Sequence, residues 1–384
     1  MNLTGNTPPA RPSLQTSFVD AALTYSAEVT RRNLESLKTF PELTRESEWA
    51  CVENGGWVGG HWTGLLWLAF SQTGDQTFEN GARQWAARLA PRQNDPTTHD
   101  LGFLFELSHV LGACVTGDAA LKPPALAAAR TLLQRFNPRG QYLQAWGPPD
   151  GTPPQRGRMI IDTMMNLGLL FWAGGETGEP RFAQVASAHA HTALRRLVRA
   201  DGSTAHVGDF DPDSGEFLGQ DTHQGLSGTS CWSRGQSWAV YGFTEAYRQT
   251  GDAAFLHAAC KVAGYALARL PTDHVPYWDY DSPLIPDDVR DSSAASALAS
   301  GLLQLAALDP DPGQAGRWRD QAISILASLW ENYSSRGRPE PSILVHGTRS
   351  KPHGLMDHGL IYGDYYFVEA LTRLKQEGAH FLMK

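Results

Sequence analysis

Two aspartates stand in or beside apolar segments, where a carboxylate needs a partner or a chemical task. Asp162 lies inside the segment IIDTMM at residues 160–165, and Asp100 directly precedes the segment LGFLF at 101–105. An ionised carboxylate among apolar side chains is costly unless it is paired. Two carboxylates in one pocket are the usual equipment for breaking a glycosidic bond, because closeness and burial separate their pKa values and let one hold a proton. Asp162 and Asp100 are therefore the candidate catalytic pair; the alternative for Asp162 is a buried carboxylate satisfied by backbone amides.

A second concentration of polar side chains lies in and just after the Gly-rich linker 200–233. It contains His206, His223 and Gln224, and Arg234 follows it directly. The linker has neither HxH nor HExxH spacing, and its aspartates lack the glycine and distal glutamate of a calcium loop, so we expect no metal site. The guanidinium of Arg234 can bind a carboxylate bidentately, and an acidic sugar would supply one. The alternative for Arg234 is a structural ion pair at the rim of the fold.

The elements that must position these residues are almost all helical. Apolar residues recur at helical spacing and predict helices at residues 17–38, 61–72, 77–90, 101–115, 122–136, 162–176, 180–199, 235–249, 252–270, 292–308, 313–333 and 358–375. Thr-Gly-Asp or Thr-Gly-Glu turns lie between successive segments at residues 73–75, 116–118, 177–179 and 250–252. The glycine suits the left-handed end of one helix and the acid suits the start of the next, so these turns predict antiparallel helix pairs.

The other connections are long and rich in Gly, Pro, Asp and His, as in 91–99, 137–161, 200–233 and 271–290. Because short turns alternate with long loops, stacked helix pairs place all the long loops on one rim. Six pairs close into an (α/α)6 double-barrel toroid of about twelve helices, an all-α fold with a funnel on the long-loop face. We expect residues 16–384 to form this barrel as a single domain and residues 1–15 to be a mobile segment. Short hairpins in the linkers are the only β-structure that we expect.

Polar residues stand at the starts of all six supposed inner helices, and ring closure brings them together at the funnel. In chain order they are Trp57 with His61 and Trp62, His99 with Asp100, Asp162, Arg234, Asp291, and Asp357 with His358. A helix start also favours aspartate as a cap, and we interpret Asp291 and Asp357 in that way.

Composition limits the partners that the protein can have. The formal net charge is −8, and the 32 Lys and Arg residues do not cluster, which argues against a nucleic-acid partner or an acidic membrane surface. No apolar run approaches the roughly 20 residues that span a bilayer, and no secretory apolar segment is visible at the N-terminus. The four cysteines lack CxxC pairs and are interpreted as reduced thiols. We therefore expect a cytoplasmic protein, a monomer or weak homo-oligomer, that acts on a small imported molecule.

Six motifs resemble, in order, those of the unsaturated glucuronyl hydrolases, family 88 of the glycoside hydrolases. The most distinctive is SRGQSWAVYGF at 233–243, and the others are WTGLLWL at 62–68, HDLGF at 99–103, IDTMMN at 161–166, DSSAA at 291–295 and GDYYFVEAL at 363–371. The resemblance covers roughly residues 45–372. The segment GGHWTG at 59–64 departs from the commoner Phe-Trp-Pro-Gly form.

The resemblance implies an (α/α)6 fold, no cofactor, and removal of the terminal 4,5-unsaturated uronic acid from oligosaccharides that polysaccharide lyases produce. An aspartate matching Asp162 protonates carbon 4 of the vinyl ether and activates water for attack at carbon 5. The hemiketal then rearranges and releases the aglycone, while the match of Asp100 assists at the ring hydroxyls. The implied substrate-binding residues are His99, His206, Gln224, Arg234, Trp238 and either Trp57 or Trp62.

Proton transfer to carbon requires an acid that is held in a dry site with a raised pKa, so we expect the pKa of Asp162 to be raised. Three alternatives remain open. They are an unsaturated rhamnogalacturonyl hydrolase acting on pectin fragments, a sugar isomerase or epimerase using histidines such as His206 and His358, and a non-catalytic carbohydrate-binding toroid.

Overall fold

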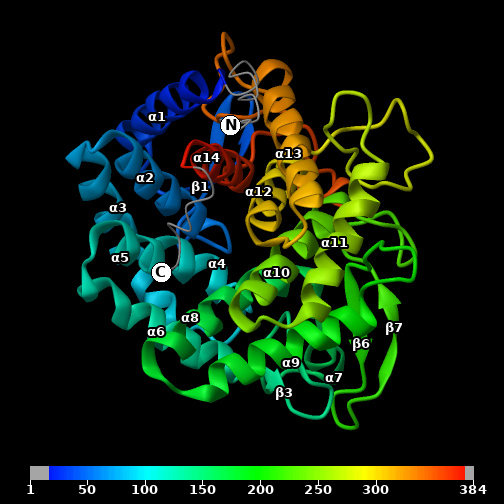
Figure 1. Ribbon diagram of the computed structural model, residues 1–384. Helices are drawn as coiled ribbons and strands as arrows, with labels where there is room; N and C mark the ends of the chain where they lie inside the picture. Colours follow the sequence, from blue (N-terminus) through cyan, green and yellow to red (C-terminus); the bar gives the residue numbers. More distant parts are fainter. Residues whose placement is uncertain (1–16, 377–384) are drawn as a thin grey trace, which may run out of the picture.

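The computed structural model describes residues 17–376, so the expected mobile segment 1–15 lies outside the described residues. Helices in two concentric layers make up most of this part (Figure 1). The inner layer contains α2 (Gly59–Thr73), α4 (Leu101–Phe105), α5 (Leu111–Thr116), α8 (Leu167–Thr177), α10 (Ser233–Thr250), α12 (Ser292–Leu308) and α14 (Ile361–Lys375). The outer layer contains α1 (Val19–Ser36), α3 (Gln76–Leu89), α6 (Lys122–Leu133), α9 (Pro180–Arg196), α11 (Ala253–Ala268) and α13 (Pro312–Asn332).

The inner helices pack on one another in chain order, and α14 contacts both α12 and α2, which closes the ring. Residues 292–305 of α12 are all buried, whereas α13 and α9 bury one face only, as the two-layer arrangement requires. The predicted (α/α)6 barrel is confirmed, and each of the twelve predicted segments contains a helix. That residues 16–384 fold as a single domain stays a prediction.

Three inner helices differ in detail from the prediction. A π-helical turn, Glu106–Val110, separates α4 from α5, and a 3-10 helix, Ile161–Asn166, precedes α8. α14 begins at Ile361, three residues later than predicted, so the interpretation of Asp357 as an N-cap is wrong. Asp291 does cap α12, because its Oδ1 accepts hydrogen bonds from the backbone amides of Ser293 and Ala294.

The Thr-Gly-Asp turns end and start helices as predicted. Gly74 is left-handed at φ +68° at the end of α2, a conformation that glycine adopts without strain. Asp75 then begins α3 by accepting from the backbone amide of Thr77 at 2.8 Å. Asp118 and Asp252 make the same bond two residues ahead, to Ala120 and Ala254. These turns lie opposite the long loops and fix each helix pair as antiparallel.

The β-structure is confined to the long connections. The strands are β1 (Phe40–Arg45), β2 (Glu48–Val52), β3 (Phe136–Asn137), β4 (Tyr142–Leu143), β5 (Arg158–Ile160), β6 (Val207–Phe210) and β7 (Phe217–Asp221). They form the antiparallel pairs β1-β2 and β3-β4 and a three-stranded sheet of order β5-β6-β7. Short helical pieces also occur at α7 (Pro153–Arg156), Ala90–Asn94, Ala119–Leu121 and Lys351–His353.

The β5-β6 pair joins two connections that are about fifty residues apart. Ile160 pairs with Val207, and the backbone amide of Ile161 donates to the carbonyl of His206 at 3.0 Å. This register places His206 beside Asp162. It is a tertiary pairing rather than the local hairpin that the sequence predicted.

The starts of α4 and of the 161–166 helix are also locked together. A Cβ atom on Gly102 would lie 2.4 Å from the Cα of Asn166, so only glycine allows this approach. The side-chain oxygen of Asn166 accepts from the backbone amide of Phe103 at 2.7 Å. The two segments that carry Asp100 and Asp162 are therefore in direct contact.

Candidate active site

A cavity of about 450 Å³ opens on the long-loop face of the barrel. Its lining residues come from the starts of inner helices and from the long connections: Trp57, His99, Asp100, Trp146, Ile160, Asp162, His223, Gln224, Trp232, Arg234, Arg349, Ser350, His353 and Leu355. Both candidate aspartates line it, so the convergence expected from ring closure is present.

Asp162 points into this cavity without being tied to backbone amides among the described residues. Its side chain is 15% exposed, and its Oδ2 lies 3.4 Å from Nε2 of His206. Oδ2 has no geometrically well-formed hydrogen bond within residues 17–376. The alternative of a carboxylate satisfied by backbone amides therefore finds no support in this geometry.

His206 is held in one tautomer by the loop that follows β7. Its Nδ1 accepts from the backbone amides of His223 at 3.1 Å and Gln224 at 3.2 Å. A ring nitrogen that accepts two N–H donors carries no proton, so the proton of the neutral imidazole resides on Nε2. That proton faces Asp162.

The pKa of Asp162 is set by opposing effects. Burial raises it, but His206, His99 and Arg234 lower it, and the net direction is downward. The expectation of a raised pKa is therefore wrong, because neighbouring groups that favour the carboxylate outweigh desolvation.

Asp100 sits at the position before α4 but makes no capping bond with its side chain. Its Oδ2 accepts from the hydroxyl of Thr98 at 2.8 Å, and its Oδ1 lies 3.4 Å from Nε2 of His99. The other nitrogen of His99, Nδ1, lies 2.9 Å from the hydroxyl of Thr163, the neighbour of Asp162. Burial lowers the pKa of His99, so this histidine is a neutral link between the two aspartates.

Arg234 lines the cavity, but its charge already has a partner. Its Nη1 pairs with Asp291 at 2.5 Å, and both side chains are essentially buried, at 1% and 0% exposure. It also donates to the carbonyls of Thr348 and Arg349, at 2.6 and 2.5 Å. The structural ion pair that the sequence left open is thus present, and Arg234 offers the cavity hydrogen-bond donors rather than a free positive charge. Gln224 donates to the same carbonyl of Arg349 at 2.9 Å.

The tryptophans divide into one cavity residue and two core residues. Trp57 lines the cavity, whereas Trp62 is fully buried and packs edge-on against Trp85. Trp238 is also fully buried, beside Phe103. The expectation that Trp62 or Trp238 contacts substrate is corrected accordingly, because both indoles fill space within the barrel.

Several cavity residues were not identified from the sequence. They are Trp146, Ile160, Trp232, Arg349, Ser350, His353 and Leu355. The rings of His223 and His353 lie 4.8 Å apart, and Trp146 packs edge-on against His223 at 5.3 Å. The signal for residues 349–355 was their place in a long connection ahead of the last inner helix, which puts them on the same rim.

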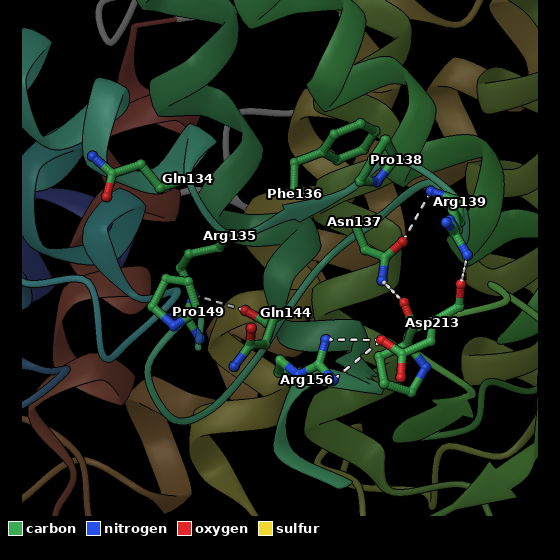
Figure 2. Close-up of a pocket in the computed structure, with 11 residues that line it drawn as sticks. Gln134, Arg135, Phe136, Asn137, Pro138, Arg139, Gln144, Pro149, Arg156 and Asp213 are labelled. Atoms are coloured by element: carbon green, nitrogen blue, oxygen red, sulfur yellow. Dashed lines mark hydrogen bonds and ion pairs between the residues drawn. The ribbon is translucent and has the colours of Figure 1, made fainter. Parts of the chain in front are cut away.

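A second cavity, of about 380 Å³, shares the 144–149 loop with the first (Figure 2). Gln144 and Pro149 line it, whereas Trp146 of the same loop faces the first cavity. Its charged lining consists of Arg135, Arg139, Arg156 and Asp213. Because it holds no pair of carboxylates, it is not the candidate catalytic site.

No group of three or more His, Cys, Asp or Glu side chains within residues 17–376 is arranged to hold a metal ion. In the same range, no helix has the length and apolar character needed to cross a bilayer.

Comparison with known proteins identifies the family of the chain. Residues 25–253 match the model of Glycosyl Hydrolase Family 88. The chain is 38% identical to an unsaturated glucuronyl hydrolase of Bacillus sp. (strain GL1), over 91% of this chain and 94% of that protein. It is 35% identical to an unsaturated chondroitin disaccharide hydrolase of Streptococcus pneumoniae (strain ATCC BAA-255 / R6), over 90% of this chain and 89% of that protein.

Solved structures show the same likeness. The crystal structure of the unsaturated glucuronyl hydrolase from Bacillus sp. GL1 superposes with a TM-score of 0.92 at 37% identity, covering 95% of this chain and 99% of that one. An unsaturated glucuronyl hydrolase specific for heparin superposes with a TM-score of 0.89 at 30% identity, covering 96% and 99%.

Proposed function

This chain belongs to family 88 of the glycosyl hydrolases and is an unsaturated glucuronyl hydrolase, and from that premise we propose that Asp162 is its proton-transfer residue. The substrate is a small oligosaccharide of the glycosaminoglycan type that ends in a 4,5-unsaturated uronic acid. The observation that carries the proposal is the position of Asp162, which lines the cavity with Asp100 and faces the protonated Nε2 of His206.

The reaction is hydration of an enol ether followed by loss of the aglycone. Asp162 donates a proton to carbon 4, and the positive charge that develops at carbon 5 is stabilised by the ring oxygen. Asp162, now a carboxylate, accepts a proton from the water that attacks carbon 5. The resulting hemiketal opens and releases the aglycone sugar. Because one carboxyl group acts twice, the separation rule for retaining and inverting carboxylate pairs does not apply.

The lowered pKa of Asp162 is compatible with this role. The unsaturated sugar carries a carboxylate on carbon 5, next to the carbon that Asp162 must protonate. A second anion and the loss of water both disfavour ionised Asp162, so substrate binding raises its pKa. The proton is thus held most firmly when substrate is present.

The surrounding residues have separable roles. His206 orients the carboxyl group of Asp162 through its Nε2 proton, and His99 links Asp162 to Asp100 through Thr163. Asp100 binds ring hydroxyls, since its carboxylate accepts from Thr98 and retains further acceptor capacity.

Binding of the sugar rests on three further side chains that line the cavity. Trp57 supplies an aromatic wall for the sugar ring. Gln224 and Arg234 present donors to the acidic group, and the carbonyl of Arg349 holds both in place. Trp238 supports this wall through Phe103, which packs against both indoles, whereas Trp62 packs against Trp85 in the core.

The decisive experiment follows the ultraviolet absorbance of the unsaturated uronate. Unsaturated disaccharides from chondroitin, hyaluronan, heparin and pectin are each incubated with the protein, and Asp162→Asn serves as the control. Loss of absorbance with release of the aglycone supports the proposal. Unchanged absorbance with all four would contradict it, and selective action on the pectin disaccharide would identify a rhamnogalacturonyl hydrolase.

A cytoplasmic location and a monomeric or weakly self-associating state are proposed from the sequence. Cell fractionation and size-exclusion chromatography test them.

A further inference from the structure

Two irregular loops bring essential parts of the candidate site to the cavity. The loop 95–100 ends in Asp100, and the loop 144–149 carries Trp146. They meet at an isolated antiparallel bridge between Thr98 and Trp146. Loops of this kind are more mobile than helices or sheets, so their geometry depends on side-chain anchors.

Arg135, just beyond the end of α6, is such an anchor. Its side chain is buried between the two loops, with the residue 2% exposed. Nε donates to the carbonyl of Gln144 at 2.8 Å, and Nη1 donates to the carbonyl of Gly147 at 2.9 Å. Nη1 also donates to the carbonyl of Pro96 in the other loop. One rigid guanidinium therefore holds both loops, which a lysine could not do with the same geometry.

The side chain of Gln144 extends this anchor along its own loop. Its Nε2 donates to the carbonyls of Trp146 at 2.7 Å and Pro148 at 2.9 Å. The backbone amide of Gln144 in turn donates to the carbonyl of Arg135 at 2.9 Å. The position of Trp146 in the cavity is thus connected to Arg135 by a continuous set of hydrogen bonds.

The charge of Arg135 also bears on the site. Burial lowers its pKa to about 10, while Asp100 and Asp95 act in the opposite direction. Arg135 therefore stays protonated at neutral pH, within electrostatic reach of Asp100. A buried cation whose hydrogen-bond partners are neutral carbonyls is costly, and the two aspartates offset that cost.

We propose that Arg135 is a positioning residue of the reaction, which clamps the loops 95–100 and 144–149 and so sets Asp100 and Trp146 relative to Asp162. The inference rests on the proposed function and adds to it a residue that touches neither substrate nor the reacting atoms. Misplacing a catalytic group by about 1 Å can cost on the order of 100-fold in rate, so a clamp at this distance from the chemistry is consequential.

The second cavity, which Arg135 lines, also provides matched control residues (Figure 2). Arg139 and Arg156 also line it, but both bind Asp213 rather than the loop 95–100. The Nε of Arg156 donates to the carbonyl of Gly151, outside the loop 144–149. Substituting either removes a guanidinium from the same cavity while leaving both loops anchored.

The experiment compares Arg135→Ala, Arg135→Lys and Arg156→Ala on an unsaturated disaccharide that the wild-type protein hydrolyses. We expect Arg135→Ala to lower kcat by roughly 10- to 100-fold and to raise KM, because Asp100 and Trp146 both move. Arg135→Lys keeps the charge and recovers part of kcat. Arg156→Ala stays within about twofold of wild type, in line with ordinary surface substitutions.

A rescue experiment separates positioning from a general loss of packing. Because Arg135 lines a cavity of about 380 Å³, free guanidinium can reach the space that Arg135→Ala leaves. Guanidinium at non-denaturing concentration should restore activity to Arg135→Ala and have no such effect on Arg156→Ala or Asp162→Asn. If Arg135→Ala does not fold, the kcat of Arg135→Lys, measured beside its melting temperature, decides the question.

The inference is overturned by near-wild-type kcat and KM in Arg135→Ala, or by a folded, inactive Arg135→Ala that guanidinium does not rescue. It is equally overturned if Arg135→Lys loses activity only in step with its melting temperature. A wild-type protein that leaves every unsaturated disaccharide intact overturns the proposed function itself, which is a distinct outcome.

Discussion

The imidazole of His206 presents its Nε2 to Oδ2 of Asp162 at 3.4 Å, and two backbone amides fix the imidazole from the other side. This arrangement places a ring N–H close to a buried carboxylate. It arises because β5 pairs with β6, which brings the two residues together across 43 intervening positions.

Asp162→Asn should keep the fold and bind substrate but lose most activity. The amide cannot deliver a proton to carbon 4, and general acid–base catalysis contributes roughly 10²- to 10⁴-fold. Loss of ultraviolet absorbance measures kcat, and a melting curve checks the fold. A variant that turns over at a near-native rate would remove Asp162 from the mechanism.

His206→Gln should shift the alkaline limb of the pH profile to higher pH. His206, His99 and Arg234 all lower the pKa of Asp162, so removing one of them raises that pKa. Because the protonated acid donates the proton, activity is lost as pH rises through this pKa, and a higher pKa moves the loss upward. We expect kcat itself to fall about 10- to 100-fold as orientation is lost. An alkaline limb that stays in place or moves downward would contradict the role of His206.

Arg234→Met should affect both stability and binding. It leaves Asp291 buried without its cation, which costs about 3–5 kcal/mol of unfolding free energy at neutral pH. The double variant Arg234→Met with Asp291→Asn removes both charges and keeps the helix cap, so it should recover much of that stability. KM should stay raised in both variants, because the donors facing the substrate are gone. Denaturant unfolding and steady-state kinetics separate the two effects; a normal KM would assign Arg234 to structure alone.

Trp57→Ala and Trp62→Ala should have opposite consequences. Trp57 lines the cavity, so its loss should raise KM several-fold with a small change in melting temperature. Trp62 is fully buried, so its loss should cost about 3–5 kcal/mol of stability. The folded fraction of Trp62→Ala should retain a normal KM. The reverse pattern would place Trp62 rather than Trp57 at the cavity.

Glu106→Gln should flatten the dependence of stability on pH. Burial raises the pKa of Glu106 to about 8; Glu245 and Glu369 also raise it, while Arg248 and Arg373 lower it. A glutamate in the unfolded chain ionises near pH 4.5, so the folded protein holds an extra proton between these two values. Stability therefore falls as pH rises across this window, by up to about 1.4 kcal/mol per pH unit. Denaturant unfolding at several pH values should show this slope in the wild type and its reduction in Glu106→Gln. Equal slopes would show that Glu106 ionises freely.

The helices were predictable because each inner or outer helix carries its own apolar period, which is a local property of the chain. The alternation of short Thr-Gly-Asp turns with long loops further predicted that all long loops share one rim. Asp162 was predictable as a site residue for a similar reason, since a carboxylate among apolar neighbours is visible in six residues of sequence.

The partners of these residues were not predictable, because they come from distant parts of the chain. Arg234 and Asp291 are 57 positions apart. Their pairing neutralises the positive charge of Arg234, which the sequence predicted to bind the acidic group of the substrate. Nothing local distinguishes Trp57 from Trp62, five residues later; Trp57 lies in the turn before α2 and lines the cavity, whereas Trp62 lies on α2 and is buried in the core. The net pKa direction of Asp162 likewise depends on three neighbours from separate elements.

The sequence by itself determined the two-layer helical barrel, the rim that carries the site and the aspartate at its centre. Apolar periodicity, turn residues and a carboxylate among apolar neighbours are all properties of contiguous residues. The tertiary structure alone decided which side chains reach the cavity, which charges are neutralised and how Arg135 holds two loops together. The physical reason is that electrostatic balance and side-chain orientation depend on distances across the ring, and those distances exist only once the ring has closed.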